Sequence, residues 1–116
     1  MIRKNDEKVV SIKEKLFDGE GQVTMRSLLN GAEEMYGKGR VFGHSTLQPG
    51  CSIGYHVHHD ESETYYFLSG LGEFNDNGNK VVVQGGDVTC TGAGEGHGIK
   101  NIGNEPLEFI TLILFK

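Results

Sequence analysis

The chain has 116 residues, which fits a single domain because domains typically have about 100–150 residues. Charged residues make up 23% of it and hydrophobic residues 36%, a composition that excludes wholesale disorder and collagen-like structure. The net charge is −5 and no cluster of Lys and Arg forms a basic surface, so we expect no nucleic-acid partner. The sequence has no run of 18 apolar residues and no apolar stretch behind Met1, so we expect no membrane partner, no signal peptide and a cytoplasmic location.

Glycine accounts for 18 residues and proline for only 2, a balance that indicates many tight turns between short strands. Short runs of β-favouring residues predict strands at 22–28, 39–48, 52–58, 64–69, 72–75, 80–83, 87–91, 96–101 and 107–115. Helical periodicity is confined to residues 12–17 and to one turn within 31–36. The sequence therefore predicts an all-β fold, a barrel or a jelly roll.

Two of these strands, at 64–68 and 107–115, are apolar or aromatic on both faces. A barrel strand with water outside should instead alternate between polar and apolar residues. The outer face of these strands is therefore expected to be covered, either by a second subunit in a homodimer or by residues 22–28 of the same chain.

The residues that carry chemistry begin in the strand at 52–58. His56 and His58 project from one face of it, about 6.6 Å apart at Cα, so two imidazole nitrogens can bind one metal ion. The polar residues 59–62 predict a turn, after which Glu63 can face the interior with the two histidines. His97 begins a later strand, after a glycine-rich loop.

Written as patterns, the two segments read G-x5-H-x-H-x4-E-x6-G over 50–70 and G-x5-G-x-G-x2-H-x3-N over 86–101. These patterns resemble the two conserved motifs of the cupin superfamily, here of the small single-domain, cupin_2-like type. The resemblance implies an all-β single domain, a cupin β-barrel or double-stranded β-helix of the jelly-roll kind. Residues 1–38 would form an N-terminal segment with a strand for the barrel or the dimer, and residues 39–116 the barrel core.

The resemblance carries metal-ligand roles onto His56, His58, Glu63 and His97, and these donors suit a divalent transition metal, Fe, Mn, Ni, Co or Zn. Four protein ligands on a six-coordinate ion leave two positions open, as expected of a site that performs chemistry. Two alternatives stay open: a metal without a catalytic role, and histidines that merely pack in the barrel core. Gly92 stands where the family usually has proline, which predicts a looser loop before His97.

Three further side chains are candidates for a catalytic role. Tyr65 shares the face of Glu63 and is expected to donate a hydrogen bond to a bound ligand or to pack in the barrel. By its strand parity, His44 is expected to face the same interior or to lie at the rim. Glu95, in the glycine-rich loop, is a candidate acid or base, with a solvated surface charge as the alternative.

Strand parity predicts the orientation of other side chains: inward for Val88 and Cys90, outward for Tyr55, exposed for His59, and a structural role for Asn101. Cys51 and Cys90 are interpreted as small buried side chains, because two cysteines without a CxxC motif do not predict a disulfide framework.

Together these residues predict a metal-dependent enzyme that acts on a small oxygen-rich metabolite. Similar cupins include dioxygenases, oxalate-type decarboxylases, sugar isomerases and lyases, so the reaction class stays open. The alternative is a non-catalytic ligand-binding or sensing module, in which the metal chelates a metabolite without turnover.

Overall fold

The computed structural model describes residues 1–116, and most of the chain lies in antiparallel strands. The ten strands are β1 (Val10–Glu14), β2 (Gln22–Leu29), β3 (Gly39–Leu47), β4 (Ser52–Val57), β5 (Glu61–Ser69), β6 (Leu71–Asp76), β7 (Asn79–Gln84), β8 (Val88–Thr91), β9 (Gly96–Asn101) and β10 (Leu107–Phe115). The helical parts are α1 (Gly31–Glu34) and the 3₁₀ turns η1 (Asn5–Glu7) and η2 (Leu16–Asp18). All nine predicted strands and the turn within 31–36 are confirmed. None of the helices is long and apolar enough to cross a membrane.

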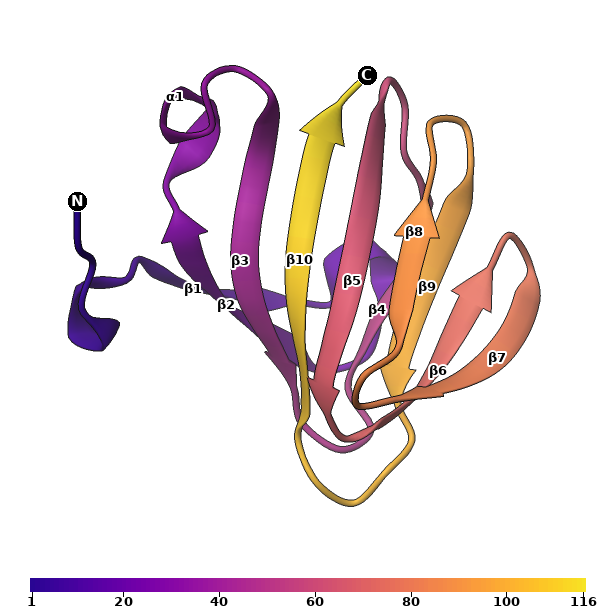
Figure 1. Cartoon of the computed structure of the whole chain (residues 1–116). Helices are drawn as coiled ribbons and strands as arrows, with labels where there is room; N and C mark the ends of the chain where they lie inside the picture. The colour runs from indigo at the N-terminus through magenta and orange to yellow at the C-terminus, as the bar shows by residue number, and fades with distance from the viewer.

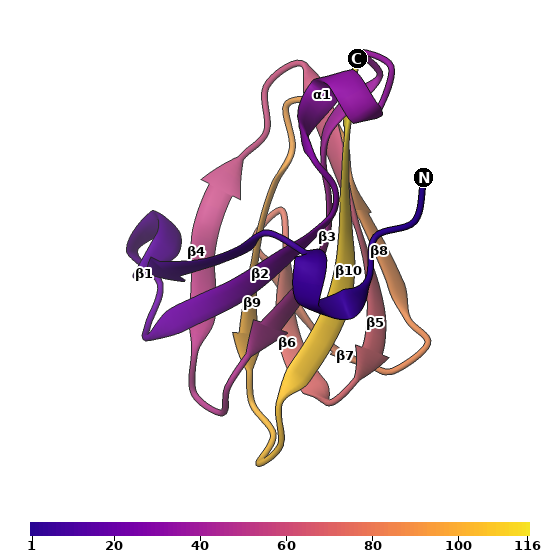
Figure 2. The ribbon, with the colours of Figure 1, turned by 90° about the vertical axis from the view of Figure 1, so that its left-hand side faces the viewer.

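The strands form two sheets that face each other as a jelly roll (Figures 1 and 2). One sheet has the order β1-β2-β3-β10-β5-β8 and the other the order β4-β9-β6-β7. From β3 onwards the chain changes sheet at every step between consecutive strands except between β6 and β7. These crossings bring distant segments side by side: β10 lies between β3 and β5, and β9 lies between β4 and β6. The all-β fold class is confirmed.

Side chains that point between the two sheets form the hydrophobic core. Along β10, every second residue from Leu107 to Ile113 is buried and the residues between them are half-exposed. These inward positions belong to a face shared by the neighbouring strands, and the core cluster comprises Val23, Leu47, Ile53, Tyr65, Phe67, Phe74, Val83, Ile99, Leu107 and Phe109. The core extends up to His97, whose ring lies 5.0 Å from that of Tyr65 and 5.6 Å from that of Phe74.

The N-terminal region differs from the prediction. Val10–Glu14 is a strand paired with β2, so the helix expected over 12–17 is wrong. The edge of β2 offers unpaired backbone groups to β1, and this pairing outweighs a short helical periodicity. Only η2 turns helically. Because β2 lies within the six-stranded sheet, residues 22–28 do not cover its outer face, and that alternative to a homodimer is wrong.

Strand β8 places its side chains opposite to the prediction. In its register with β5, Thr89 pairs with Tyr65 and therefore shares the interior face. Val88 and Cys90 point outward and are exposed, so the expectation that they face inward is wrong. Cys51 is half-buried and Cys90 is exposed, so the interpretation of both as buried side chains is wrong. Both cysteines are free thiols.

Candidate metal centre

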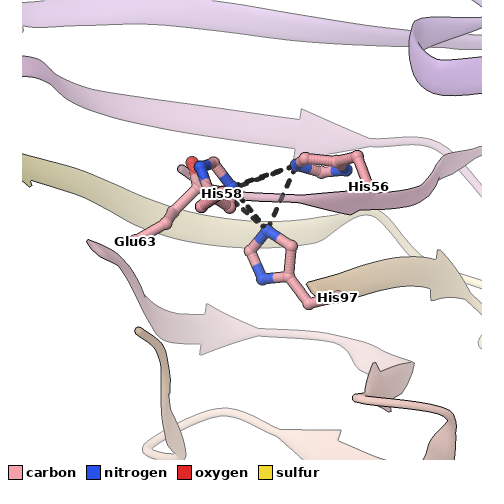
Figure 3. A group of neighbouring side chains, drawn as sticks. All are labelled: His56, His58, Glu63 and His97. Carbon is pink, nitrogen blue, oxygen red and sulfur yellow. Dashed lines mark hydrogen bonds and ion pairs between the residues drawn. The ribbon is translucent and has the colours of Figure 1, made fainter. Parts of the chain in front are cut away.

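Segments from both sheets bring four potential metal-ligating side chains to one place (Figure 3). His56 lies in β4 and pairs with His97 of β9, His58 follows the end of β4, and Glu63 lies in β5. Two backbone hydrogen bonds, of 2.7 and 3.0 Å, tie His58 to the loop that precedes β9. One ligating atom from each side chain lies within 4.8 Å of all the others, so the two motifs meet as their spacing predicted.

The separations between these atoms match those of donors around one metal ion. The Nε2 atoms of the three histidines lie 3.1, 3.1 and 3.2 Å apart. Oε1 of Glu63 lies 2.9 Å from Nε2 of His58 and 2.7 Å from that of His97, but 3.9 Å from that of His56. With bonds near 2.0–2.1 Å, neighbouring corners of an octahedron are about 2.9 Å apart and opposite corners about 4.1 Å. Five short separations and one long one fit four corners, with two adjacent corners free.

The other ring nitrogen of each histidine is held by the chain. Nδ1 of His56 lies 2.8 Å from the Gly54 carbonyl oxygen, that of His58 lies 2.9 Å from Oε1 of Glu61, and that of His97 lies 2.8 Å from Oγ1 of Thr91. A carbonyl and a carboxylate only accept, so Nδ1 of His56 and Nδ1 of His58 donate to them, and in the neutral ring Nε2 offers its lone pair to the shared centre. Lone pairs that converge beside a carboxylate suit a divalent cation.

Burial and the histidines act in opposite directions on the pKa of Glu63. Burial acts to raise it, but the three histidine rings that surround the carboxylate outweigh burial and hold the pKa well below its usual range. The hydrogen bond to Glu63 raises the pKa of His58, whereas burial lowers the pKa of His97. The Glu63 carboxylate is therefore ionised at neutral pH and offers a negative charge to a cation.

Glu61 and Arg40 extend this cluster outward, and the sequence analysis missed both. Arg40 donates from Nε and Nη2 to the two carboxylate oxygens of Glu61, each at 2.7 Å, and this fork lowers the pKa of Glu61 to about 2. The register of β3 against β10 shifts at Arg40, and such a bulge redirects a side chain. The spacing of Glu61, two residues before Glu63, was the available signal. The turn expected over 59–62 hid it, because β5 already begins at Glu61.

A cavity of about 410 Å³ adjoins the cluster on the side of the six-stranded sheet. His56, His58 and Glu63 line it, whereas His97 is fully buried and does not. A cavity of this size lies within the range of small-molecule sites, about 300–1,000 Å³. A small molecule in it can therefore reach the point where the ligating atoms converge.

The turn η2 lies at the edge of this cavity and was not predicted to take part. The ring of Phe17 stacks on the imidazole of His56, with centroids 3.9 Å apart and planes at 10°. Lys15, Phe17 and Asp18 have left-handed φ angles of 47°, 52° and 62°, a conformation that non-glycine residues rarely adopt and that clusters at functional sites. Gly54 permits the close approach, since a Cβ there would lie 1.8 Å from the carbonyl oxygen of Phe17.

Of the three further candidates, only Tyr65 borders the cavity. Its ring is 2% exposed and stacks on His97, so it packs in the core and also lines the cavity. Burial, and then the charge of Glu63, raises the pKa of its hydroxyl well above the usual value. Tyr65 therefore keeps its proton at neutral pH.

The structure does not bring His44 or Glu95 into the cavity. His44 lies on the outer face of the sheet, with Nε2 3.2 Å from Oε2 of Glu108, so the expectation that it faces the interior is wrong. Glu95 is exposed and its carboxylate accepts from the backbone N–H of Gly92 at 2.7 Å. Proline would lack that N–H, so Gly92 lets the loop form a hydrogen bond that the family's usual proline could not.

The remaining predictions of orientation agree with the structure. Tyr55 and His59 are exposed. Asn101 is buried and donates to the carbonyl oxygens of Leu47 and Glu105, each at 2.8 Å, which fastens the loop before β10.

Comparisons with known proteins agree with this fold and this cluster. A family model described as a cupin domain matches residues 43–113. The oxalate-binding protein of Thermotoga maritima is 47% identical over 96 residues, which cover 83% of this chain and 78% of that protein. A solved structure described as a predicted oxalate decarboxylase of Thermotoga maritima has a TM-score of 0.94 and 40% identity, with both chains fully covered.

A more distant solved structure, KdgF from Halomonas sp., has a TM-score of 0.78 and 15% identity over the whole of this chain and 94% of its own, which shows the fold alone. The family model spans more than half of the chain, and both Thermotoga maritima relatives exceed 30% identity. The two motifs, the jelly roll and these matches agree: the chain belongs to the cupin family, with a histidine and glutamate cluster suited to a divalent metal.

Proposed function

We propose that His56, His58, Glu63 and His97 bind a divalent transition metal, Fe, Mn, Ni, Co or Zn, and that the protein binds a small oxygen-rich acid through it. Oxalate is the simplest such acid. The observation that carries the proposal is the set of separations among the ligating atoms, which would suit one metal ion with positions left for further ligands, next to a cavity lined by three of the four residues. Two oxygens of one small acid suit two adjacent corners. The names of the two Thermotoga maritima relatives support the same class of ligand.

When bound, the metal supplies positive charge that attracts an acid and polarises its carboxyl groups. The chain contributes what surrounds that charge. Lys13 lines the cavity and adds a cationic group for an anionic ligand in a protein whose net charge is −5. Tyr65 presents a protonated hydroxyl that can donate a hydrogen bond, and the stacked ring of Phe17 shields one side of His56 from water.

A second candidate function, decarboxylation of the same class of acid, is favoured by Tyr65. Decarboxylation breaks a carbon–carbon bond, releases carbon dioxide and leaves an electron pair on the remaining carbon, which must take up a proton. Tyr65 holds a proton in the cavity at neutral pH and is the side chain we assign to supply it. Formate would be the product from oxalate.

The test starts from protein purified without oxygen and analysed for metal. We expect about one divalent ion per chain and, by calorimetry, saturable binding of oxalate to the metal-loaded protein but not to the metal-free protein. His58→Ala should lose the metal, while the matched control His59→Ala, at an exposed neighbour, should keep it. Full metal content in His58→Ala would refute the ligand assignment, and formate release would decide between binding and turnover.

A further inference from the structure

Two hydroxyl-bearing side chains on the wall of the cavity make no side-chain hydrogen bond within the chain. Ser45 in β3 is 1% exposed and Thr111 in β10 is 2% exposed, and both line the cavity. Neither hydroxyl takes part in a side-chain hydrogen bond, in contrast to the neighbouring Thr46 and Thr91. The hydroxyl of Thr89 is buried and also lacks a partner, but Thr89 does not line this cavity. Buried polar groups are nearly always satisfied, so a partner for Ser45 and Thr111 is expected inside the cavity.

The sheet register places these two hydroxyls next to each other. Ser45 pairs with Phe109 and Thr111 pairs with Gly43, which makes Ser45 and Thr111 diagonal neighbours on the inner face, about 7–8 Å apart. Gly43 has no side chain, so nothing projects into the cavity between Val41 and Ser45 along β3. On its other side Thr111 pairs with Tyr65 of β5.

We propose that Ser45 and Thr111 form a second recognition point for the acid held at the cluster, an inference that rests on the proposed function. Each hydroxyl has one O–H to donate, so the pair suits the two oxygens of a carboxylate. The ligand this arrangement selects chelates the metal at one end and carries a second carboxylate beyond it. It is therefore longer than oxalate, whose two carboxylates are both used in chelation.

The surroundings of the pair agree with a ligand that is polar at both ends. Met25, Ile53 and Ile113 line the cavity without offering a hydrogen-bond partner, whereas Lys13, Arg26 and Arg40 also line it and carry positive charge. A second carboxylate therefore finds a positively charged cavity and two hydroxyl donors, at Ser45 and Thr111, that the chain leaves free. Hydrogen bonds to a charged group are stronger than those between neutral groups, so these two hydroxyls can distinguish two acids that differ in one carboxylate.

The test compares two acids that chelate metal through the same α-hydroxycarboxylate group. L-Malate carries a second carboxylate and L-lactate carries a methyl group instead. With manganese-loaded protein and calorimetry, the double variant Ser45→Ala/Thr111→Val should bind malate about tenfold more weakly than wild type. The same variant should bind lactate within about twofold of wild type. Thr64→Val is the matched control: it lies on β5, pairs with outward-facing Cys90, and should leave both affinities unchanged.

If Ser45 and Thr111 only stabilised the fold, the melting temperature of the metal-free protein would change in the opposite direction. Since neither hydroxyl is hydrogen-bonded within the chain, the metal-free double variant should melt at or above the wild-type temperature, whereas loss of a structural hydrogen bond would lower it. If the double variant does not fold, Ser45→Ala alone should bind malate about three- to fivefold more weakly than wild type and bind lactate with unchanged affinity.

The outcomes separate the two proposals. Suppose that oxalate or lactate binds, and that the double variant either binds malate as tightly as wild type or loses affinity for malate and lactate equally. The recognition point is then wrong and the proposed function stands. If none of the three acids binds metal-loaded wild type, the proposed function fails and the recognition point fails with it.

Discussion

His58 is the most firmly held of the proposed ligands. Its backbone is tied to the loop before β9, its Nδ1 donates to Glu61, and Glu61 is held on both oxygens by Arg40. A carboxylate behind a ligating histidine fixes the ring and makes its other nitrogen a better donor. Arg40 is half-exposed, so the ion pair it forms is a positioning device for His58 more than a source of stability.

We expect Glu61→Gln to weaken metal binding by about 10–100-fold without abolishing it, because the amide still accepts a hydrogen bond but carries no charge. Competition with a chromophoric chelator measures this directly. Glu105→Gln, at an exposed carboxylate far from His58 in sequence, is the control. Equal affinities in Glu61→Gln and wild type would show that Glu61 does not act on His58.

The same carboxylate predicts a pH effect on the stability of the metal-free protein. The folded pKa of Glu61 is about 2, below the ordinary value of 4.5, because Arg40 holds its ionised form. A group whose pKa is lowered by folding stabilises the folded state above the ordinary pKa, and this contribution is lost as pH falls towards the folded pKa. The melting temperature of wild type should exceed that of Glu61→Gln at pH 6, and the difference should shrink between about pH 4.5 and 2. A difference that grows as pH falls would contradict this account.

The connection between β1 and β2, which contains η2, contacts the cluster although the sequence did not predict it. Its C-terminal part is fastened to β4, since the backbones of Glu20 and Ser52 are hydrogen-bonded at 2.8 Å and Glu20 N also donates to Oγ of Ser52. These anchors hold Phe17 against His56 in a left-handed conformation. The connection therefore acts as a strap across the edge of the cavity.

Removal of the Phe17 ring should change the rate of metal dissociation more than the free energy of unfolding. Phe17 is 53% exposed, so Phe17→Ala should lower the free energy of unfolding by only about 1 kcal/mol. Without the stacked ring, water and chelators reach His56 more easily, and we expect the metal to dissociate several-fold faster in stopped-flow chelation. Tyr36→Ala, at an aromatic ring that is 89% exposed, is the control. Unchanged dissociation in Phe17→Ala would mean that the ring does not shield the cluster.

Regular strands are the elements whose side chains could be placed from the sequence. The resemblance to the cupin motifs implied the four cluster residues, and strand parity placed Tyr65 beside them, because a period of two fixes the face of a regular strand. The same alternation gave the wrong orientation for His44 and Cys90. A β-strand of unknown register can present either face to the interior. Register depends on pairing with β10 or β5, which single-sequence patterns do not contain.

Irregular backbone accounts for what was missed altogether. Arg40 reaches Glu61 only through a bulge, and Phe17 reaches His56 only through left-handed residues. Neither feature has a period, and neither residue is a typical metal ligand. The unpartnered hydroxyls of Ser45 and Thr111 were also beyond reach, because the lack of a partner is a property of the folded cavity.

At the scale of the whole molecule, the outer face of the six-stranded sheet stays uncovered in the single chain. Tyr66, Leu68 and Val88 are exposed on it by 45–62%, and Ile110 and Leu112 are half-buried beside them. The prediction of covered outer faces on β5 and β10 is not met within the chain, since β1 and β2 extend the sheet at its edge. Apolar side chains of neighbouring strands in one contiguous patch are typical of an interface.

A second copy of the chain is the partner we expect for this face. A stable interface buries about 800 Å² on each subunit, which an open face of several strands can supply. Light scattering should therefore give twice the chain mass of 12.7 kDa. Tyr66→Glu, which places a charge on β5 without disturbing the core, should shift the protein to monomer. Val81→Glu, at an equally exposed position in the other sheet, should stay dimeric. A wild-type monomer at 100 μM, or equal dissociation of both variants, would exclude this face as the interface. The cavity lies on the other side of the sheet, so metal binding should persist in the Tyr66→Glu monomer.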